Sequence, residues 1–336
     1  MSVNSIYVTQ AVNSASALVP TQSRHWRLLL VAALSIATCR AVYGEPVRVP
    51  GTRVSLSPPP GFSPAQQFPG FEDVDIQSSI MVTELPGPAS DMKRGMTRAA
   101  LASRGMTLLQ SSTAEVQGDN ALLLHVRQPS PSGDVRKWML IAGDRTRTVM
   151  IVGSYPTAAP IEVGEAVKRS LLGADLGLTV AAPSAFEGLQ FRVTPTAALR
   201  VAGRVSNLLT LTESGMMTPQ NADAAVYVLG HSIGNVAIED LRAFSETRLR
   251  QTTRMRGITT VSGRPTTLDR LEAYELEADG ADASTGRRVH IYQVIAPDAT
   301  GYFIIQGFVA AARAAAVVPE FKKVTATFRR TTEPED

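Results

Sequence analysis

The segment Gly230-His231-Ser232-Ile233-Gly234 has the Gly-x-Ser-x-Gly spacing of a hydrolase nucleophile loop. In α/β-hydrolases this loop joins a buried strand to a helix, and its tight turn presents the serine hydroxyl for attack. Here an apolar stretch that predicts a strand precedes the motif, and a stretch with helical periodicity follows it. The chemistry also needs an acid and then a histidine later in the chain. Only His290 is available downstream, with Asp269, Asp279 or Asp282 as the acid.

If this motif is catalytic, the protein is a secreted serine hydrolase with the triad Ser232, Asp279 and His290, and we keep this function as the alternative to a non-enzymatic role. Three features argue against it. His290 falls in residues 287–295, whose alternation predicts a strand, whereas a catalytic histidine belongs on a loop. No His-Gly-Gly-type oxyanion segment precedes the serine, and the corresponding place in an internal repeat, residues 84–89, reads ELPGPA. Since a five-residue motif alone is weak evidence, we interpret it as an ordinary loop between a strand and a helix.

A second group of candidate residues is basic. Arginines recur along and just after the helix predicted for 238–252, and they could dock an anionic partner such as a phosphate-bearing glycan or a lipid head group. The candidates for partner binding are Arg242, Arg250 and Arg254. Because Glu239, Asp240 and Glu246 lie among them, a solvated helix face explains the same pattern.

No metal or cofactor is predicted. The four histidines do not have metal-ligand spacing, and the acidic residues do not form a calcium loop. The glycines are scattered and form neither a phosphate loop nor a dinucleotide fingerprint.

Residues 1–44 are predicted to be a secretory signal. A basic flank precedes the apolar run Leu28–Ala37, and Val42-Tyr43-Gly44 ends in a small residue at a plausible cleavage point. The run is shorter than the roughly 20 residues of a membrane-spanning helix, so we expect no transmembrane span in the mature chain. The sequence therefore predicts a periplasmic or secreted protein. Lipidation at Cys39, the only cysteine, is the alternative.

The basic character of the chain comes from this signal. The sequence has 33 basic and 30 acidic residues, and three of the basic ones are Arg24, Arg27 and Arg40. Residues 1–44 contain no acidic residue, so the predicted mature chain has no net charge. We therefore expect no nucleic-acid partner.

The same series of landmarks occurs twice in the chain. A strand followed by an amphipathic helix is predicted at Ser79–Gly105 and again at Ala225–Gly257. Matching landmarks follow in the same order in both copies: Gly51 with Gly188, Gly105 with Gly257, Gly118 with Gly263, Gly153 with Gly307, and Val167–Arg169 with Phe321–Lys323. Two tandem repeats, 45–175 and 185–331, follow, joined by a linker at Gly173–Ser184. Ser232 should then lie on an exposed loop near the place of Gly87.

Each repeat is predicted to be α+β. In the first, a helix runs from Asp91 to Gly105, strands follow at Ala121–Gln128, Val135–Ile141 and Thr146–Tyr155, and a helix closes the repeat at Ile161–Leu172. Short links join the strands, and parallel neighbours would need long crossovers. The sequence thus predicts two mostly antiparallel sheets, each packed against helices.

This pattern resembles the PsbP-like fold, which photosystem PsbP proteins share with the envelope protein DcrB. The resemblance rests on an opening glycine and short strand (Gly51–Pro58), the strand–helix unit Ser79–Gly105, the turn Val116-Gln117-Gly118, a long hairpin and a final strand and helix. It implies a non-catalytic binding or assembly module and transfers no site residues. We therefore expect an exported, non-enzymatic envelope protein whose partner is another envelope protein or a small ligand.

Overall fold

The computed structural model describes residues 45–130, 133–218, 221–234 and 236–331. The predicted signal and Cys39 lie outside these residues.

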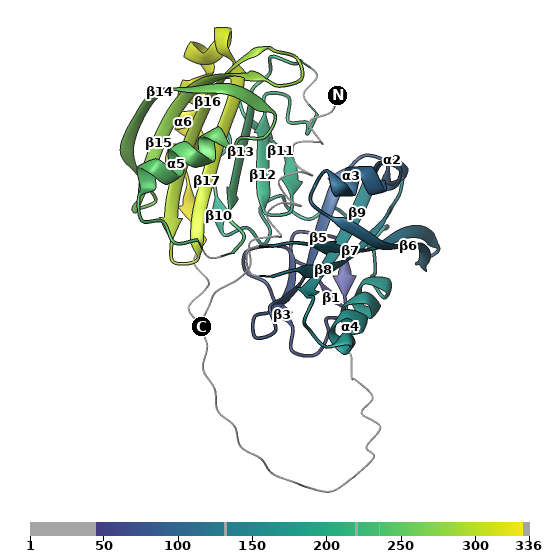
Figure 1. The fold of residues 1–336 in the computed structure, drawn as a ribbon. Helices are drawn as coiled ribbons and strands as arrows, with labels where there is room; N and C mark the ends of the chain where they lie inside the picture. Colours follow the sequence, from purple (N-terminus) through teal and green to yellow (C-terminus); the bar gives the residue numbers. More distant parts are fainter. Residues whose placement is uncertain (1–44, 131–132, 219–220, 235, 332–336) are drawn as a thin grey trace, which may run out of the picture.

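The first half of the chain forms a seven-stranded antiparallel sheet in the order β3-β4-β5-β9-β8-β7-β6 (Figure 1). Its strands are β3 (Ser63–Pro64), β4 (Gly70–Asp73), β5 (Ser78–Pro86), β6 (Thr107–Val116), β7 (Asp119–Gln128), β8 (Val135–Gly143) and β9 (Arg147–Pro156). Its helices are α2 (Ala89–Gly95), α3 (Arg98–Ala102) and α4 (Ile161–Leu172). A short ribbon of β1 (Val47–Arg48) and β2 (Ser55–Leu56) precedes the sheet.

The second half repeats this arrangement, in the order β11-β12-β13-β17-β16-β15-β14. Its strands are β11 (Arg200–Val205), β12 (Leu208–Thr212), β13 (Val226–His231), β14 (Met255–Leu268), β15 (Leu271–Asp282), β16 (Arg288–Asp298) and β17 (Gly301–Ala310). Its helices are α5 (Leu241–Arg250), η1 (Ala311–Arg313) and α6 (Ala314–Ala326), and β10 (Phe191–Arg192) pairs with β18 (Arg329–Arg330). The two sheets have the same strand order, so the predicted fold of two tandem α+β repeats is confirmed.

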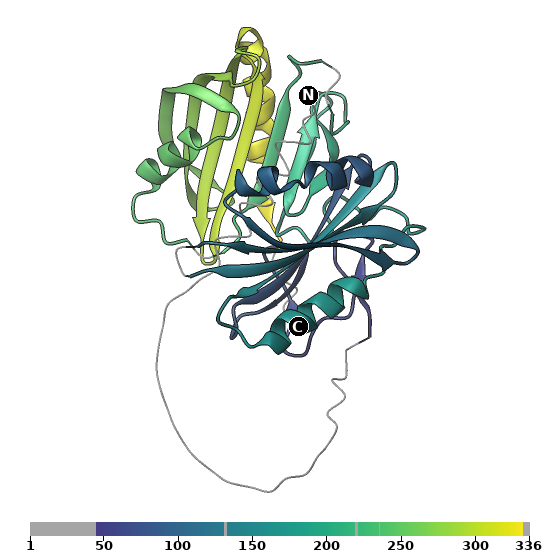
Figure 2. The ribbon, with the colours of Figure 1, turned by 45° about the vertical axis from the view of Figure 1, so that its right-hand side comes forward.

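Each sheet is covered on both faces. In the first domain α4 packs on one face through Val167 and Leu171, while α2 and α3 cover the other near Met96 and Leu101 (Figure 2). In the second domain α6 lies behind the sheet in Figure 1 and α5 in front of it. Because each sheet has two covered faces, its central strands are apolar on both sides, as in β9.

Gly153 and Gly307 are equivalent positions that let the closing helices approach their sheets. Gly153 lies in the middle of β9, and a Cβ there would collide with Val167 of α4. Gly307 lies in the middle of β17, and a Cβ there would collide with the ring of Phe321 of α6. The pairing of Gly153 with Gly307 and of Val167 with Phe321 thus matches the structure. Both glycines serve close helix–sheet packing rather than a turn.

We expect Gly153→Ala and Gly307→Ala each to lower the free energy of unfolding by about 1–3 kcal/mol, since an added methyl group overpacks the core. Urea unfolding followed by circular dichroism measures the change. Gly95→Ala is the control for glycine replacement, because nothing lies within 4 Å of a Cβ there and the φ of Gly95 is not positive. A loss at Gly153 and Gly307 no larger than that at Gly95 would contradict the packing role.

Two details of the sequence prediction are wrong. The helix predicted for 91–105 is broken, because Gly95 weakens the first piece and Thr97 caps the second by accepting a hydrogen bond from the Ala100 N–H at 3.2 Å. Gly263 lies inside β14 rather than at a turn. The turn equivalent to Gln117-Gly118 is Asp269-Arg270, since all four residues have positive φ.

The predicted linker is only partly a linker. Asp175 forms a bridge with Ser55 through two backbone hydrogen bonds of 2.9 Å, and Leu176 is fully buried. The start of 173–184 is therefore part of the first domain.

Candidate functional site

The serine of the Gly-x-Ser-x-Gly motif extends the pairing of β13 with β17. The Ser232 N–H donates to the carbonyl of Tyr302 at 2.8 Å, and the Ser232 hydroxyl accepts a hydrogen bond from the Tyr302 N–H at 3.0 Å. The hydroxyl thus has a backbone partner instead of a catalytic base.

The adjacent His231 is also engaged. Its Nδ1 lies 2.8 Å from the carbonyl oxygen of Ser232, and its Nε2 lies 3.0 Å from Oδ2 of Asp298. Burial opposes ionisation of Asp298, but His231 and the Thr300 N–H outweigh it and hold the pKa of this carboxyl below its usual value. With both ring nitrogens facing oxygen acceptors, His231 offers no free nitrogen to the Ser232 hydroxyl.

The structure separates Ser232 from the predicted base. His231 pairs with Phe303 of β17 and His290 with Val309, six residues further along the same strand. At about 3.3 Å per residue this is roughly 20 Å. His290 does meet Asp279, at 2.8 Å, and also Glu277, at 3.2 Å. The predicted acid and base are therefore together, but the serine is at the other end of the sheet.

The three candidate partner-binding arginines do not form one cluster. Arg242 and Arg250 share Glu246, at 3.0 and 3.8 Å, whereas Arg254 follows the helix and donates to the hydroxyl of Ser284 at 3.4 Å. Their role in binding a partner stays a prediction.

The motif loop instead joins the two domains. Gln67 of the first domain accepts a hydrogen bond from the Gly234 N–H at 2.6 Å and donates to the Thr300 carbonyl at 2.8 Å. Ile233 is buried against Phe68 and Met81. The expectation that Ser232 lies on an exposed loop is therefore wrong, because the first domain covers this loop. When the two sheets are aligned by their strand registers, Ser232 is equivalent to Leu85, two residues from the expected Gly87.

A second contact between the domains is apolar. Val205 of β11 is fully buried in the cluster that contains Leu85, Met150 and Val152 of the first domain. Met217 packs on the same cluster. The core between the first sheet and α2–α3 is thus completed by the second domain.

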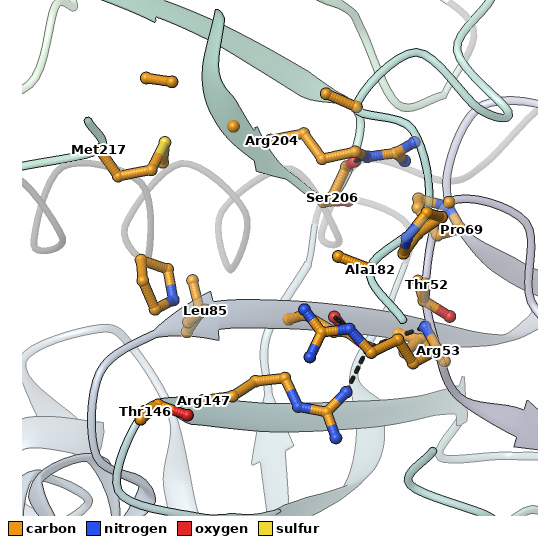
Figure 3. A pocket seen from close by; sticks show the side chains of 18 residues that line it. Thr52, Arg53, Pro69, Leu85, Thr146, Arg147, Ala182, Arg204, Ser206 and Met217 are labelled. Carbon is orange, nitrogen blue, oxygen red and sulfur yellow. Dashed lines mark hydrogen bonds and ion pairs between the residues drawn. The ribbon is translucent and has the colours of Figure 1, made fainter. Parts of the chain in front are cut away.

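A cavity of about 350 Å³ lies between the domains, next to these contacts (Figure 3). Three arginines and one carboxylate line it. Arg53 comes from the loop between β1 and β2, Glu84 from β5, Arg147 from β9 and Arg204 from β11. The rest of the wall is largely apolar and includes Pro69, Val82, Leu85, Ala182 and Met217.

Glu84 fixes two of these arginines. Its Oε1 accepts from Arg147 Nη1 and from the Arg53 N–H, both at 2.9 Å, and its Oε2 lies 3.7 Å from Arg53 Nε. The second terminal nitrogen of Arg147 donates to the Leu176 carbonyl at 2.8 Å. The Nε of Arg53 is buried without a hydrogen-bond partner among the described residues, and Figure 3 shows the side chain beside that of Arg147.

Arg204 approaches from the second domain. Its Nε donates to the Ser206 carbonyl at 2.9 Å and its Nη1 to the Glu187 carbonyl, while its Nη2 is buried without a partner among the described residues. Burial lowers the pKa of Arg204 to about 10, although Glu187 and Glu84 oppose this shift.

Sequence analysis missed this cavity, although one signal was present. In β5 the residues Ile80, Val82 and Glu84 share a face of the strand, so an acidic residue falls on a row that is otherwise core-facing. The arginines could not be assigned, because their separation in sequence is large and packing between two domains brings them together.

Comparison with known proteins finds related folds among solved structures. No family model and no curated protein matches the chain. LpqN of Mycobacterium tuberculosis, described as involved in cell envelope biogenesis, is 13% identical, with a TM-score of 0.31 over 42% of this chain and 83% of its own. The T6SS immunity protein TplEi of Pseudomonas aeruginosa is 10% identical, with a TM-score of 0.31 over 84% and 96%.

A third structure, cyanobacterial PsbP from Synechocystis, is 13% identical, with a TM-score of 0.24 over 42% of this chain and 82% of its own. A PsbP protein is thus among the solved structures to which this chain is similar. Within the described ranges, no helix is long and apolar enough to cross a membrane, and no three His, Cys, Asp or Glu side chains are placed to hold a metal ion.

Proposed function

We propose that the chain is an exported, non-enzymatic binding protein of the cell envelope, with residues 45–175 and 185–331 as its two domains. One observation carries the proposal: the motif loop that would hold a nucleophile is used to join the domains, through Ile233 and the Gly234 N–H. The polar cavity lies elsewhere, at the domain junction. Its arginines suit recognition of a ligand or of a partner's side chain.

Export is supported by the basic flank, the apolar run and the small-residue exit in residues 1–44. A non-catalytic role is supported by the engagement of both His231 nitrogens and by the distance of His290 from Ser232. The partner is then an envelope protein or a small ligand.

We expect the full chain, expressed in a Gram-negative host, to appear in the periplasm or the medium with its N-terminus near Glu45, and Ser232 not to react with a fluorophosphonate probe. An unassisted serine hydroxyl is a weak nucleophile. Cell fractionation, intact mass and probe labelling test both parts, with Ser232→Ala as the matched control.

Two results would contradict the proposal. Retention of residues 1–44 in a cytosolic protein would remove the envelope assignment. Labelling of Ser232 that disappears in Ser232→Ala and falls in His290→Ala would establish the hydrolase instead.

A further inference from the structure

We propose that the cavity between the domains binds an amphiphilic oxyanion, with its carboxylate or phosphate group between Arg53 and Arg204 and its apolar chain against Val82, Leu85 and Met217. The inference rests on the proposed binding function and names the chemical class of the ligand.

The charge of the cavity supports an anionic ligand. Three guanidinium groups line it, and Glu84 is the one carboxylate among the lining residues. Glu84 binds Arg147 directly and lies beside Arg53, whereas Arg204 donates only to backbone carbonyls. Glu187 also lies near Arg204, but its carboxylate forms an ion pair with Arg48. The site therefore holds more positive than negative charge, and an anion would balance the excess.

The hydrogen-bonding capacity of the two outer arginines points the same way. The Nε of Arg53 and the Nη2 of Arg204 are both buried without a hydrogen-bond partner among the described residues. A guanidinium group presents paired N–H donors whose geometry matches a carboxylate or phosphate. Because Arg53 and Arg204 belong to different domains, one oxyanion between them would connect the domains (Figure 3).

The volume and the remaining wall define the rest of the ligand. The cavity of about 350 Å³ is near the lower end of the range of small-molecule sites. Its apolar residues include Val82 and Leu85 of β5 and Met217, and Leu85 and Met217 belong to one apolar cluster. An inorganic anion would satisfy the arginines but leave this wall without a partner, so we expect a short hydrocarbon chain on the anion.

Isothermal titration calorimetry on the mature chain tests the proposal, with n-octyl phosphate and octanoate below their micellar concentrations. We expect saturable binding of one molecule per chain, and the two arms distinguish a phosphate from a carboxylate head group. Inorganic phosphate should bind at least about tenfold more weakly, because the chain contacts are lost. Octanol, which carries no charge, should not bind.

Two variants locate the site. Arg204→Met should weaken binding by about tenfold to a hundredfold, since a charge-assisted contact is lost. Ala182→Asp keeps every arginine and adds a carboxylate to the wall, so it should weaken binding while leaving the melting temperature unchanged. Arg200→Met is the matched control, because Arg200 lies on the same strand but donates to the Glu213 carbonyl outside the cavity. It should bind as the original chain does.

Absence of saturable binding by both amphiphiles would overturn the proposal, as would binding that neither Arg204→Met nor Ala182→Asp weakens. Binding of inorganic phosphate as tight as that of octyl phosphate would overturn the apolar part. These results are independent of the fractionation and labelling experiments, so this site can fail while the proposed function stands.

Discussion

Glu84→Gln is expected to lower the free energy of unfolding of the first domain by about 3–5 kcal/mol, the usual cost of removing one partner of a buried ion pair. The side chain of Arg147 is 6% exposed and that of Glu84 17%, and their atoms lie 2.9 Å apart. The amide keeps the volume of the carboxylate and one acceptor oxygen, but it has no negative charge to pair with Arg147, whose other side-chain partner is the Leu176 carbonyl. Urea unfolding followed by the fluorescence of Trp138 measures the loss.

Two comparisons make this result specific. Asp91→Asn removes a carboxylate from the exposed pair with Arg94, whose side chains are 61% and 73% exposed, and should cost less than about 1 kcal/mol. The double variant Glu84→Gln, Arg147→Met removes both charges and should recover most of the lost stability. A loss from Glu84→Gln as small as that from Asp91→Asn would show that the cavity hydrates Arg147 well enough without its partner.

Glu84 also shows how far the sequence could predict the fold. The apolar stretch at 79–85 and the short links between the strands of 121–155 are local signals, and they were sufficient for antiparallel strands and for the repeat. The match of residues 149–154 with 303–308 paired Gly153 and Gly307 correctly. Gly118 was paired wrongly because β14 has 14 residues and β6 has 10, so the hairpins turn at different places in the two sequences.

The functional site was harder to predict, because equivalent positions contain different chemistry. Glu84 pairs with Val149, which lies four residues before Gly153, and His231 pairs with Phe303, which lies four residues before Gly307. Glu84 and His231 are therefore equivalent positions of the two domains. In the first domain this position binds Arg147, while in the second it binds Asp298. In the sequence, Ser232 and the adjacent His231 fit a hydrolase motif and therefore suggest catalysis. Only the docking of Gln67 and Ile233 shows that this loop holds the domains together.

Lys137→Met is expected to stabilise the first domain by about 3 kcal/mol at pH 7, because one pKa unit corresponds to about 1.4 kcal/mol. Lys137 lies in β8 between Val126 and Ser154, is 2% exposed, and has neither a hydrogen bond nor an ion pair with any described residue. Burial lowers its pKa to about 8. Methionine fills a similar volume without an ammonium group that must lose its hydration.

The pH dependence tests the cause. The unfolded chain holds the Lys137 proton up to about pH 10.4, whereas the folded chain releases it near pH 8, so the unfolded state binds more protons between these values. The stability of the original chain should therefore rise toward that of Lys137→Met across this window, and the difference should shrink above it. Arg136→Met, an exposed change on the same strand, should shift stability by less than about 1 kcal/mol at every pH. If Lys137→Met is instead less stable at pH 7, the ammonium group has a stabilising partner, and burial of an unpaired charge is not what sets its pKa.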